Sequence, residues 1–331
     1  MSQVIAPVRH FDRISETIPW SEGQTVRIRI PRESWIQQMV LKLWGTIDIG
    51  VADATAVATE SPLQAIRRIR VLANGNPLTT WTGPLAYRYA QFRNHFAPGI
   101  IPPGVTVGAQ PFEVLIPLGP SYRRDFEETD NLIPANAYDT LEVEITCGSV
   151  TLDFLVPDTT TTLAVTANMR VYSRHHIPGP TGAARQLYTE VHQRTVAAAA
   201  AEVPLYFRKH GVYLRSVLLR QVSGDVGEEA LVNTVVTQIR EQAGGYDLRP
   251  WTLTGSMLRL YELETDMAIP DGYIHIPKNL EGKGKEAIRM ANVGNEYVLY
   301  KSEAIPGNSN LVDVLFVCQT EDAAATSVIP R

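Results

Sequence analysis

The chain has 331 residues, which is enough for two domains of about 150–180 residues each. Hydrophobic residues make up 44 % and charged residues 20 %, so a sizeable core is available and intrinsic disorder is excluded. The formal net charge of −5 argues against a protein that binds nucleic acid mainly through its phosphates. Two cysteines, Cys147 and Cys318, are too few for a disulfide framework or a zinc cage, and we expect two buried free thiols.

The sequence shows no membrane-spanning or signal segment. Arg9, Asp12 and Arg13 interrupt the apolar positions near the N-terminus, so no signal-peptide core is expected there. The longest apolar run, residues 196–201, is far shorter than the roughly 20 residues of a spanning helix. We therefore expect a chain that does not cross a membrane.

Alternation of apolar and polar residues predicts many short β-strands. In chain order, the alternating stretches are residues 26–30, 39–44, 112–118, 141–145 and 165–171. Clusters of Gly, Pro, Asn and Asp separate the strands, as in residues 73–77. Because the strands follow one another without intervening helices, the pattern favours an all-β antiparallel sandwich or barrel.

Two segments depart from this pattern. Leu85, Tyr89 and Phe92 follow Gly83–Pro84 at helical spacing, which predicts a short amphipathic helix that starts near the proline. A second short helix is predicted to begin near Ser256. An irregular aromatic-rich loop is the alternative in both places.

An internal repeat organises the chain. The residues of one hairpin recur 170 residues later, so that Ile69 is matched by Ile239 and Ala73 by Ala243. After two inserted residues the offset becomes 172. Because the whole order of strands, turn and aromatic segment repeats in register, we predict two copies of one β-sandwich. Repeat-equivalent core residues are then Trp81, Trp251, Gly83, Gly255, Tyr89 and Tyr261.

Proline and glycine mark the junction between the copies. The predicted organisation is an N-terminal arm, a first sandwich, a linker, a second sandwich and a C-terminal tail, at residues 1–19, 20–176, 177–186, 187–320 and 321–331. The adjacent His175 and His176 are assigned to this junction rather than to a metal site.

The sequence contains no recognisable catalytic, cofactor-binding or metal-binding constellation. Its seven histidines form neither His-x-His nor His-Glu-x-x-His, which argues against a cupin-like metal site. The stretch 282–285 lacks the flanking residues of a phosphate-binding loop. A charged stretch is expected to form salt bridges at a subunit boundary rather than a glycosidase carboxylate pair. The candidate interface residues are Arg123, Arg124, Asp125, Glu127 and Glu128.

Over nearly its whole length, the chain resembles the double jelly-roll major capsid proteins of tailless icosahedral viruses, especially bacteriophages with an internal membrane. The resemblance rests on the duplicated strand order, the Ile-Arg-x-x-x-Ala-(Asn/Gly)-Gly hairpin followed by Trp and Thr-Gly, the short linker and the N-terminal arm. It implies two tandem eight-stranded jelly rolls with short helices in the inter-strand loops. It also implies a structural protein without enzymatic activity or cofactor.

The resemblance further implies a homotrimer of pseudo-hexagonal outline, made in the host cytoplasm and built into the virion shell. Its expected partners are neighbouring trimers, penton or minor capsid proteins and an internal lipid membrane, with no sequence-specific nucleic-acid binding. Arg67, Arg68 and Arg70 are candidates for contact with lipid or a neighbouring chain. The alternatives are a minor capsid or spike protein, and a duplicated sandwich that binds or processes carbohydrate.

Overall fold

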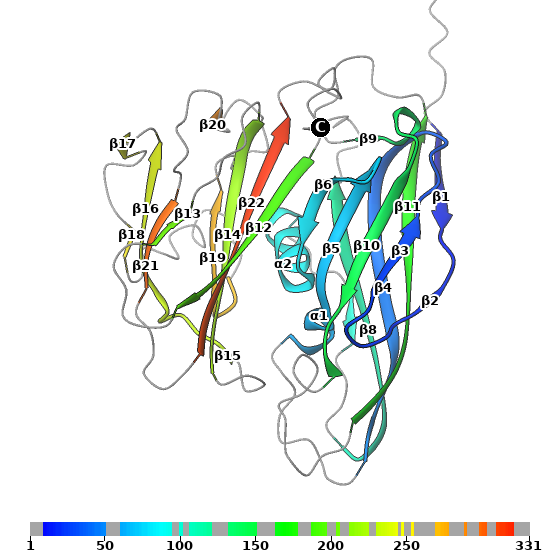
Figure 1. The fold of residues 1–331 in the computed structure, drawn as a ribbon, viewed down its shortest axis with the longest axis horizontal. Coiled ribbons are helices and arrows are strands. Elements are labelled where there is room, and N and C mark those ends of the chain that lie inside the picture. The colour runs from blue at the N-terminus through cyan, green and yellow to red at the C-terminus, as the bar shows by residue number, and fades with distance from the viewer. Residues whose placement is uncertain are drawn as a thin grey trace, which may run out of the picture.

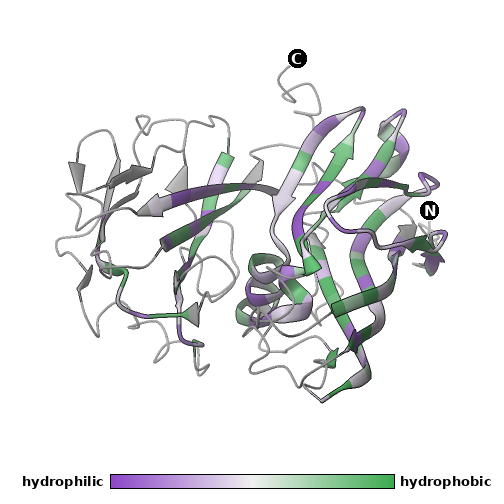
Figure 2. Cartoon of the chain, turned by 60° about the horizontal axis from the view of Figure 1, so that its bottom comes forward, coloured by the Kyte–Doolittle hydropathy of each residue, from purple (hydrophilic) through white to green (hydrophobic). Residues whose placement is uncertain are grey.

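The structure is a computed structural model, and long antiparallel strands form most of it. It describes residues 9–50, 60–94, 99–101, 106–120, 132–150, 163–177, 187–196, 203–205, 212–224, 230–243, 246–247, 253–254, 269–277, 288–289, 298–302 and 309–320. Hydrophobic and hydrophilic residues alternate along the strands, as Figure 2 shows in green and purple. A strand with this alternation turns one side toward a core. The strands build two sandwiches that stand side by side, which confirms the predicted double jelly roll (Figure 1).

The first sandwich consists of two antiparallel sheets. One follows the order β1-β11-β4-β8-β7, with β2 paired to β11 and β9 to β4. The other follows the order β3-β10-β5-β6. The strands are β1 (Arg9–Ile14), β2 (Ile18–Pro19), β3 (Thr25–Arg29), β4 (Trp35–Ile49), β5 (Ile66–Ala73), β6 (Asn76–Trp81), β7 (Ile100–Ile101), β8 (Gly108–Pro120), β9 (Ile133–Pro134), β10 (Leu141–Cys147) and β11 (Leu163–Ile177).

The second sandwich has the same plan. One sheet follows the order β12-β22-β14-β15, with β19 and β20 paired to β14, and the other follows β13-β21-β16-β17, with β18 paired to β16. The strands are β12 (Leu187–Val196), β13 (Val203–Leu205), β14 (Val212–Gly224), β15 (Ala230–Leu231), β16 (Val236–Ala243), β17 (Tyr246–Asp247), β18 (Leu253–Thr254), β19 (Tyr273–Pro277), β20 (Ile288–Arg289), β21 (Val298–Ser302) and β22 (Ser309–Thr320).

The two sandwiches share details of register as well as strand order. The register of β4 against β11 skips Gln37, and that of β14 against β22 skips Arg215, which marks a β-bulge at each position. These positions are 178 residues apart, and at the same offset Ile36 of β4 matches Leu214 of β14 and Leu41 matches Leu219. Beside each bulge, a short strand pairs with the two preceding residues. β9 pairs with Trp35 and Ile36 of β4, and β20 pairs with the equivalent residues of β14, 178 positions later. The shared bulge supports a duplication of one unit.

The hairpin repeat needs one correction. Ile69 pairs with Trp81, whereas its counterpart Ile239 pairs with Leu253. Leu253, rather than Trp251, therefore has the ladder position of Trp81. The two inserted residues belong inside the second hairpin rather than after it.

The predicted N-terminal arm was wrong for residues 9–14 and 18–19, because β1 and β2 extend the first sheet beside β11. Ion pairs fasten β1 to the sandwich, from Arg13 to Glu33 at 2.6 Å and from Arg174 to Asp12 at 2.8 Å. Pairing with β11, about 160 residues away in the sequence, decides the conformation of this segment.

His175 and His176 were also wrongly assigned to the junction, since both lie within β11. His175 is buried, and its two ring nitrogens lie 3.1 Å and 3.0 Å from the hydroxyls of Ser34 and Ser173. The ring of Phe11 stacks on it at 4.9 Å. His175 is therefore a hydrogen-bonded core residue.

Short helices lie in the inter-strand connections. The predicted helix after Gly83–Pro84 is confirmed as α2 (Gly83–Asn94), and α1 (Ser61–Gln64) and a 3₁₀ turn (Ala135–Ala137) were not predicted. The helix predicted near Ser256 lies outside the described residues. None of the helices in the described part of the chain is long and apolar enough to cross a membrane.

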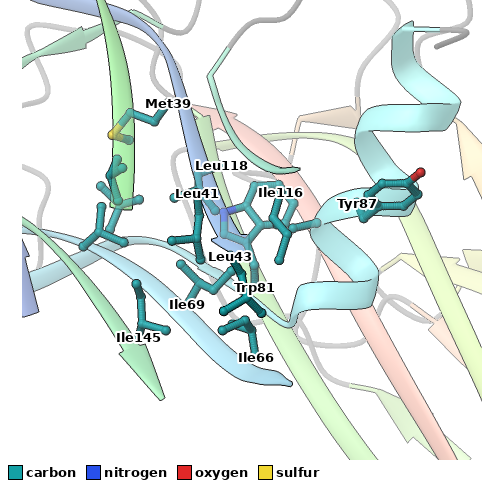
Figure 3. Close-up of a cluster of buried hydrophobic side chains, with 14 of the residues drawn as sticks. Met39, Leu41, Leu43, Ile66, Ile69, Trp81, Tyr87, Ile116, Leu118 and Ile145 are labelled. Carbon is teal, nitrogen blue, oxygen red and sulfur yellow. The ribbon is translucent and has the colours of Figure 1, made fainter. Parts of the chain in front are cut away.

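Large side chains fill the first sandwich. Leu41, Leu43 and Ile116 from one sheet meet Ile69 and Trp81 from the other (Figure 3). A separate cluster of aliphatic residues and Phe316 fills the second sandwich. Both cysteines are buried thiols, as predicted, and burial raises the pKa of the Cys147 thiol.

A Gly83→Ala substitution tests the close approach of α1 and α2. A Cβ at Gly83 would lie 2.0 Å from the backbone oxygen of Leu63. We expect the substitution to lower the free energy of unfolding by about 1–3 kcal/mol, measured by urea titration. Gly99→Ala is the control, because its Cβ would meet only a side-chain carbon at 3.7 Å. Equal losses in the two variants would contradict this packing.

Acid should weaken the fold through His175. Burial is the main cause that lowers the pKa of His175 below its ordinary value of 6.5. The unfolded chain therefore binds a proton more readily, and stability is lost as the pH falls below about 6.5. We expect the melting temperature of the wild type to fall more steeply with acid than that of His175→Gln. Parallel pH profiles would contradict the prediction.

Candidate functional site at the junction of the two sandwiches

The two sandwiches meet along β6 and α2 on one side and β12, β14 and β19 on the other (Figure 1). The hydroxyl of Thr189 on β12 accepts a hydrogen bond from the Thr80 amide at 2.9 Å and donates one to the Thr80 carbonyl at 2.8 Å. Phe92 of α2 stacks on His275 at 5.2 Å and meets Tyr273 edge-on. The junction thus combines hydrogen bonds with aromatic packing.

A buried carboxylate lies at the centre of the junction. The side chain of Glu60, immediately before α1, is 0 % exposed. It accepts hydrogen bonds from the Tyr273 hydroxyl at 2.7 Å and 2.8 Å, and from Nε of Arg88 and Nε of Arg220 at 3.0 Å each. Arg88 belongs to the first sandwich, whereas Tyr273 and Arg220 belong to the second. The carboxylate therefore ties the sandwiches together.

A second carboxylate balances the charge. Nη1 of Arg220 lies 3.3 Å from Oδ2 of Asp313 on β22. With Glu60 and Arg88, the cluster contains two acidic and two basic side chains, so its formal charges cancel. Burial raises the pKa of Asp313, and the neighbouring Arg220 offsets part of that rise.

The surroundings keep Arg220 charged and Tyr273 protonated. Burial acts to lower the pKa of Arg220, but the neighbouring carboxylates of Glu60 and Asp313 raise it above its ordinary value. Burial and the nearby Glu60 raise the pKa of Tyr273 well above its ordinary value. Tyr273 thus donates a hydrogen bond to Glu60, and Arg220 lies as a cation between two carboxylates.

A cleft of about 630 Å³ opens beside this cluster. Both sandwiches contribute to it, and the side chains of Arg220 and Asp313 reach it from the second. The first sandwich contributes Arg67 and Arg68 of β5, both exposed. The cleft is therefore lined by side chains of both charges.

The arginines proposed from the sequence do not behave alike. Arg67 and Arg68 line the cleft, whereas Arg70 is partly buried, with Nε 3.0 Å from the Glu144 carboxylate. Glu144 also pairs with Arg27 at 2.9 Å. Arg70 thus belongs to an ion-pair ladder across β3, β10 and β5.

The structure describes only some of the other residues proposed from the sequence. Trp81, Gly83 and Tyr89 are buried, and the rings of Trp81 and Tyr89 lie 5.7 Å apart. The remaining proposed residues lie outside the described part of the chain: Arg123, Arg124, Asp125, Glu127, Glu128, Trp251, Gly255 and Tyr261.

Sequence reasoning missed the junction cluster. Arg220 directly follows the apolar run Val217–Leu219, and Asp313 interrupts the apolar run from Leu311 to Val317. A charged residue within such a run is a signal of a buried ion pair. Among the described residues, no group of three or more His, Cys, Asp or Glu side chains gathers to hold a metal ion.

Removing Arg220 should destabilise the protein strongly. Arg220→Met leaves Glu60 and Asp313 without their shared cation, and we expect a loss of about 3–5 kcal/mol in the free energy of unfolding. Arg13→Met is the control, because its ion pair with Glu33 is exposed and contributes about 0–1 kcal/mol. Similar losses in both variants, measured by urea titration, would show that the junction cluster does not hold the sandwiches.

Comparisons with known proteins identify the fold. No family model matches the sequence, and no curated protein matches it. The structure is similar to the MCP of STIV, Sulfolobus Turreted Icosahedral Virus, with a TM-score of 0.73 and 13 % sequence identity, covering 98 % of this chain and 100 % of that one.

Two further solved structures show the same likeness. The Faustovirus major capsid protein gives a TM-score of 0.64 at 10 % identity, covering 97 % of this chain and 91 % of that one. The major capsid protein P2 from bacteriophage PM2 gives a TM-score of 0.59 at 10 % identity, covering 94 % and 97 %. Along nearly its whole length, the chain therefore has the double jelly-roll fold of these viral capsid proteins.

Proposed function

We propose that this chain is a major capsid protein, a structural subunit that assembles as pseudo-hexagonal homotrimers into an icosahedral virion shell. The observation that carries the proposal is the pair of sandwiches with one strand order and one bulge position, joined by a buried ion-pair cluster. Three such chains supply six similar units around a threefold axis, which suits a near-hexagonal tile. The full-length likeness to viral capsid proteins supports the same function.

The proposal includes the division of the chain into jelly rolls at residues 20–176 and 187–320, with β1 and β2 added to the first. It also includes a structural rather than enzymatic role, supported by likeness to capsid proteins. The proposal further includes a bacteriophage origin, an internal membrane, and penton or minor capsid proteins as partners. The bacteriophage PM2 protein among the similar structures supports the first of these.

The proposal assigns Arg67 and Arg68 to contact with a neighbouring chain or lipid. Both are exposed, whereas the Glu144 carboxylate holds Arg70 within its own sheet. The charged stretch with Arg123, Arg124, Asp125, Glu127 and Glu128 remains the proposed subunit interface.

Light scattering after size exclusion tests the assembly. A capsomer predicts a stable species of three 36.6-kDa chains, with larger assemblies as the concentration rises. Obligate interfaces of this kind are large and partly apolar, so the trimer should persist on dilution. A monomer at every concentration would overturn the proposed trimer.

A further inference from the structure

The cleft at the junction has an unused hydrogen-bond donor. Nε of Arg220 donates to Glu60 and Nη1 to Asp313, while Nη2 has no hydrogen-bond partner among the described residues. The side chain is 5 % exposed and contributes to the lining of the cleft. A buried guanidinium with an unused N–H is unfavourable unless an acceptor reaches it. Oδ1 of Asp313, in the same lining, has no hydrogen-bond partner among the described residues either, so the cleft is suited to a ligand that carries both an oxygen acceptor and an N–H donor.

The charge of the lining favours a carboxylate. Arg67, Arg68 and Arg220 contribute three positive charges and Asp313 one negative charge, which leaves a formal net charge of +2. Arginine binds carboxylates well through its planar fork of donors. The Asp313 carboxylate beside Arg220 repels a dianionic phosphate more strongly than a singly charged acid.

The rest of the lining is partly apolar. It includes five apolar residues from both sandwiches: Ile66, Trp81, Pro84, Val191 and Leu311. A segment that combines acidic side chains with an aromatic ring would match both parts of this surface.

We propose that the cleft receives the acidic segment 123–130 of a neighbouring copy of this chain, an inference that rests on the proposed function. Its two arginines and four acidic residues give a formal net charge of −2, which complements the +2 of the cleft. Phe126, between Asp125 and Glu127, supplies the aromatic ring. The candidate subunit interface thus gains a defined counterpart on the next chain.

A charge swap tests the contact. We expect the double variant Arg67→Glu with Arg68→Glu to shift the light-scattering mass from trimer toward monomer. Adding Glu127→Arg and Glu128→Arg should restore the trimer, because attraction returns with both signs reversed. The control is Arg29→Glu, whose side chain is 90 % exposed on the same sheet as Arg67 and Arg68. It should leave the mass unchanged.

The binding of a peptide tests the cleft independently of trimer assembly. The host is the full chain carrying Asp125→Asn, Glu127→Gln, Glu128→Gln and Asp130→Asn, which cannot fill its neighbours' clefts with acid. A fluorescent peptide of sequence RRDFEETDN should bind this host saturably. Its affinity should fall by about tenfold or more when Arg67→Glu and Arg68→Glu are added.

The outcomes separate this inference from the proposed function. An intact trimer in the Arg67→Glu, Arg68→Glu variant, together with no peptide binding, would overturn the inference and leave the capsid role standing. A monomeric wild type would overturn the trimer, while peptide binding would still support the cleft as a carboxylate site. Displacement of the peptide by low concentrations of inorganic phosphate would contradict the carboxylate assignment.

Discussion

The buried carboxylate of Glu60 is the interaction on which the arrangement of the molecule depends. It precedes α1 in the first sandwich, yet two of its three partners, Arg220 and Tyr273, come from the second. An ionised carboxylate out of water is stable only when it is paired and hydrogen-bonded. All its partners are in place in only one relative position of the sandwiches, so the requirement of one side chain fixes the geometry of both.

This constraint suits the proposed capsid role of the duplicated fold. Two copies of one sandwich on a flexible connection would present their surfaces at many angles, and such a chain could not tile a closed shell. With the junction locked by Glu60, Thr189 and Phe92, the chain is one block with two similar units. In the proposed pseudo-hexagonal capsomer, a threefold assembly of such blocks would repeat nearly the same contact six times.

Local patterns predicted the fold and missed the junction. Alternation located the strands, the hairpin repeat revealed the duplication, and Gly83–Pro84 marked α2. Glu60 pairs with Arg220, 160 residues away, and with Tyr273, 213 residues away, so no local pattern carries that contact. The pairing of β1 with β11 and the burial of His175 escaped prediction for the same reason: partners distant in sequence decide both.

Differential scanning calorimetry of the wild-type chain tests most directly whether the junction makes the two sandwiches one unit. A locked junction predicts a single unfolding transition, with a calorimetric enthalpy equal to the van't Hoff enthalpy of the whole chain. Two separable transitions, each accounting for about half of the enthalpy, would contradict the account. They would show that the sandwiches unfold independently.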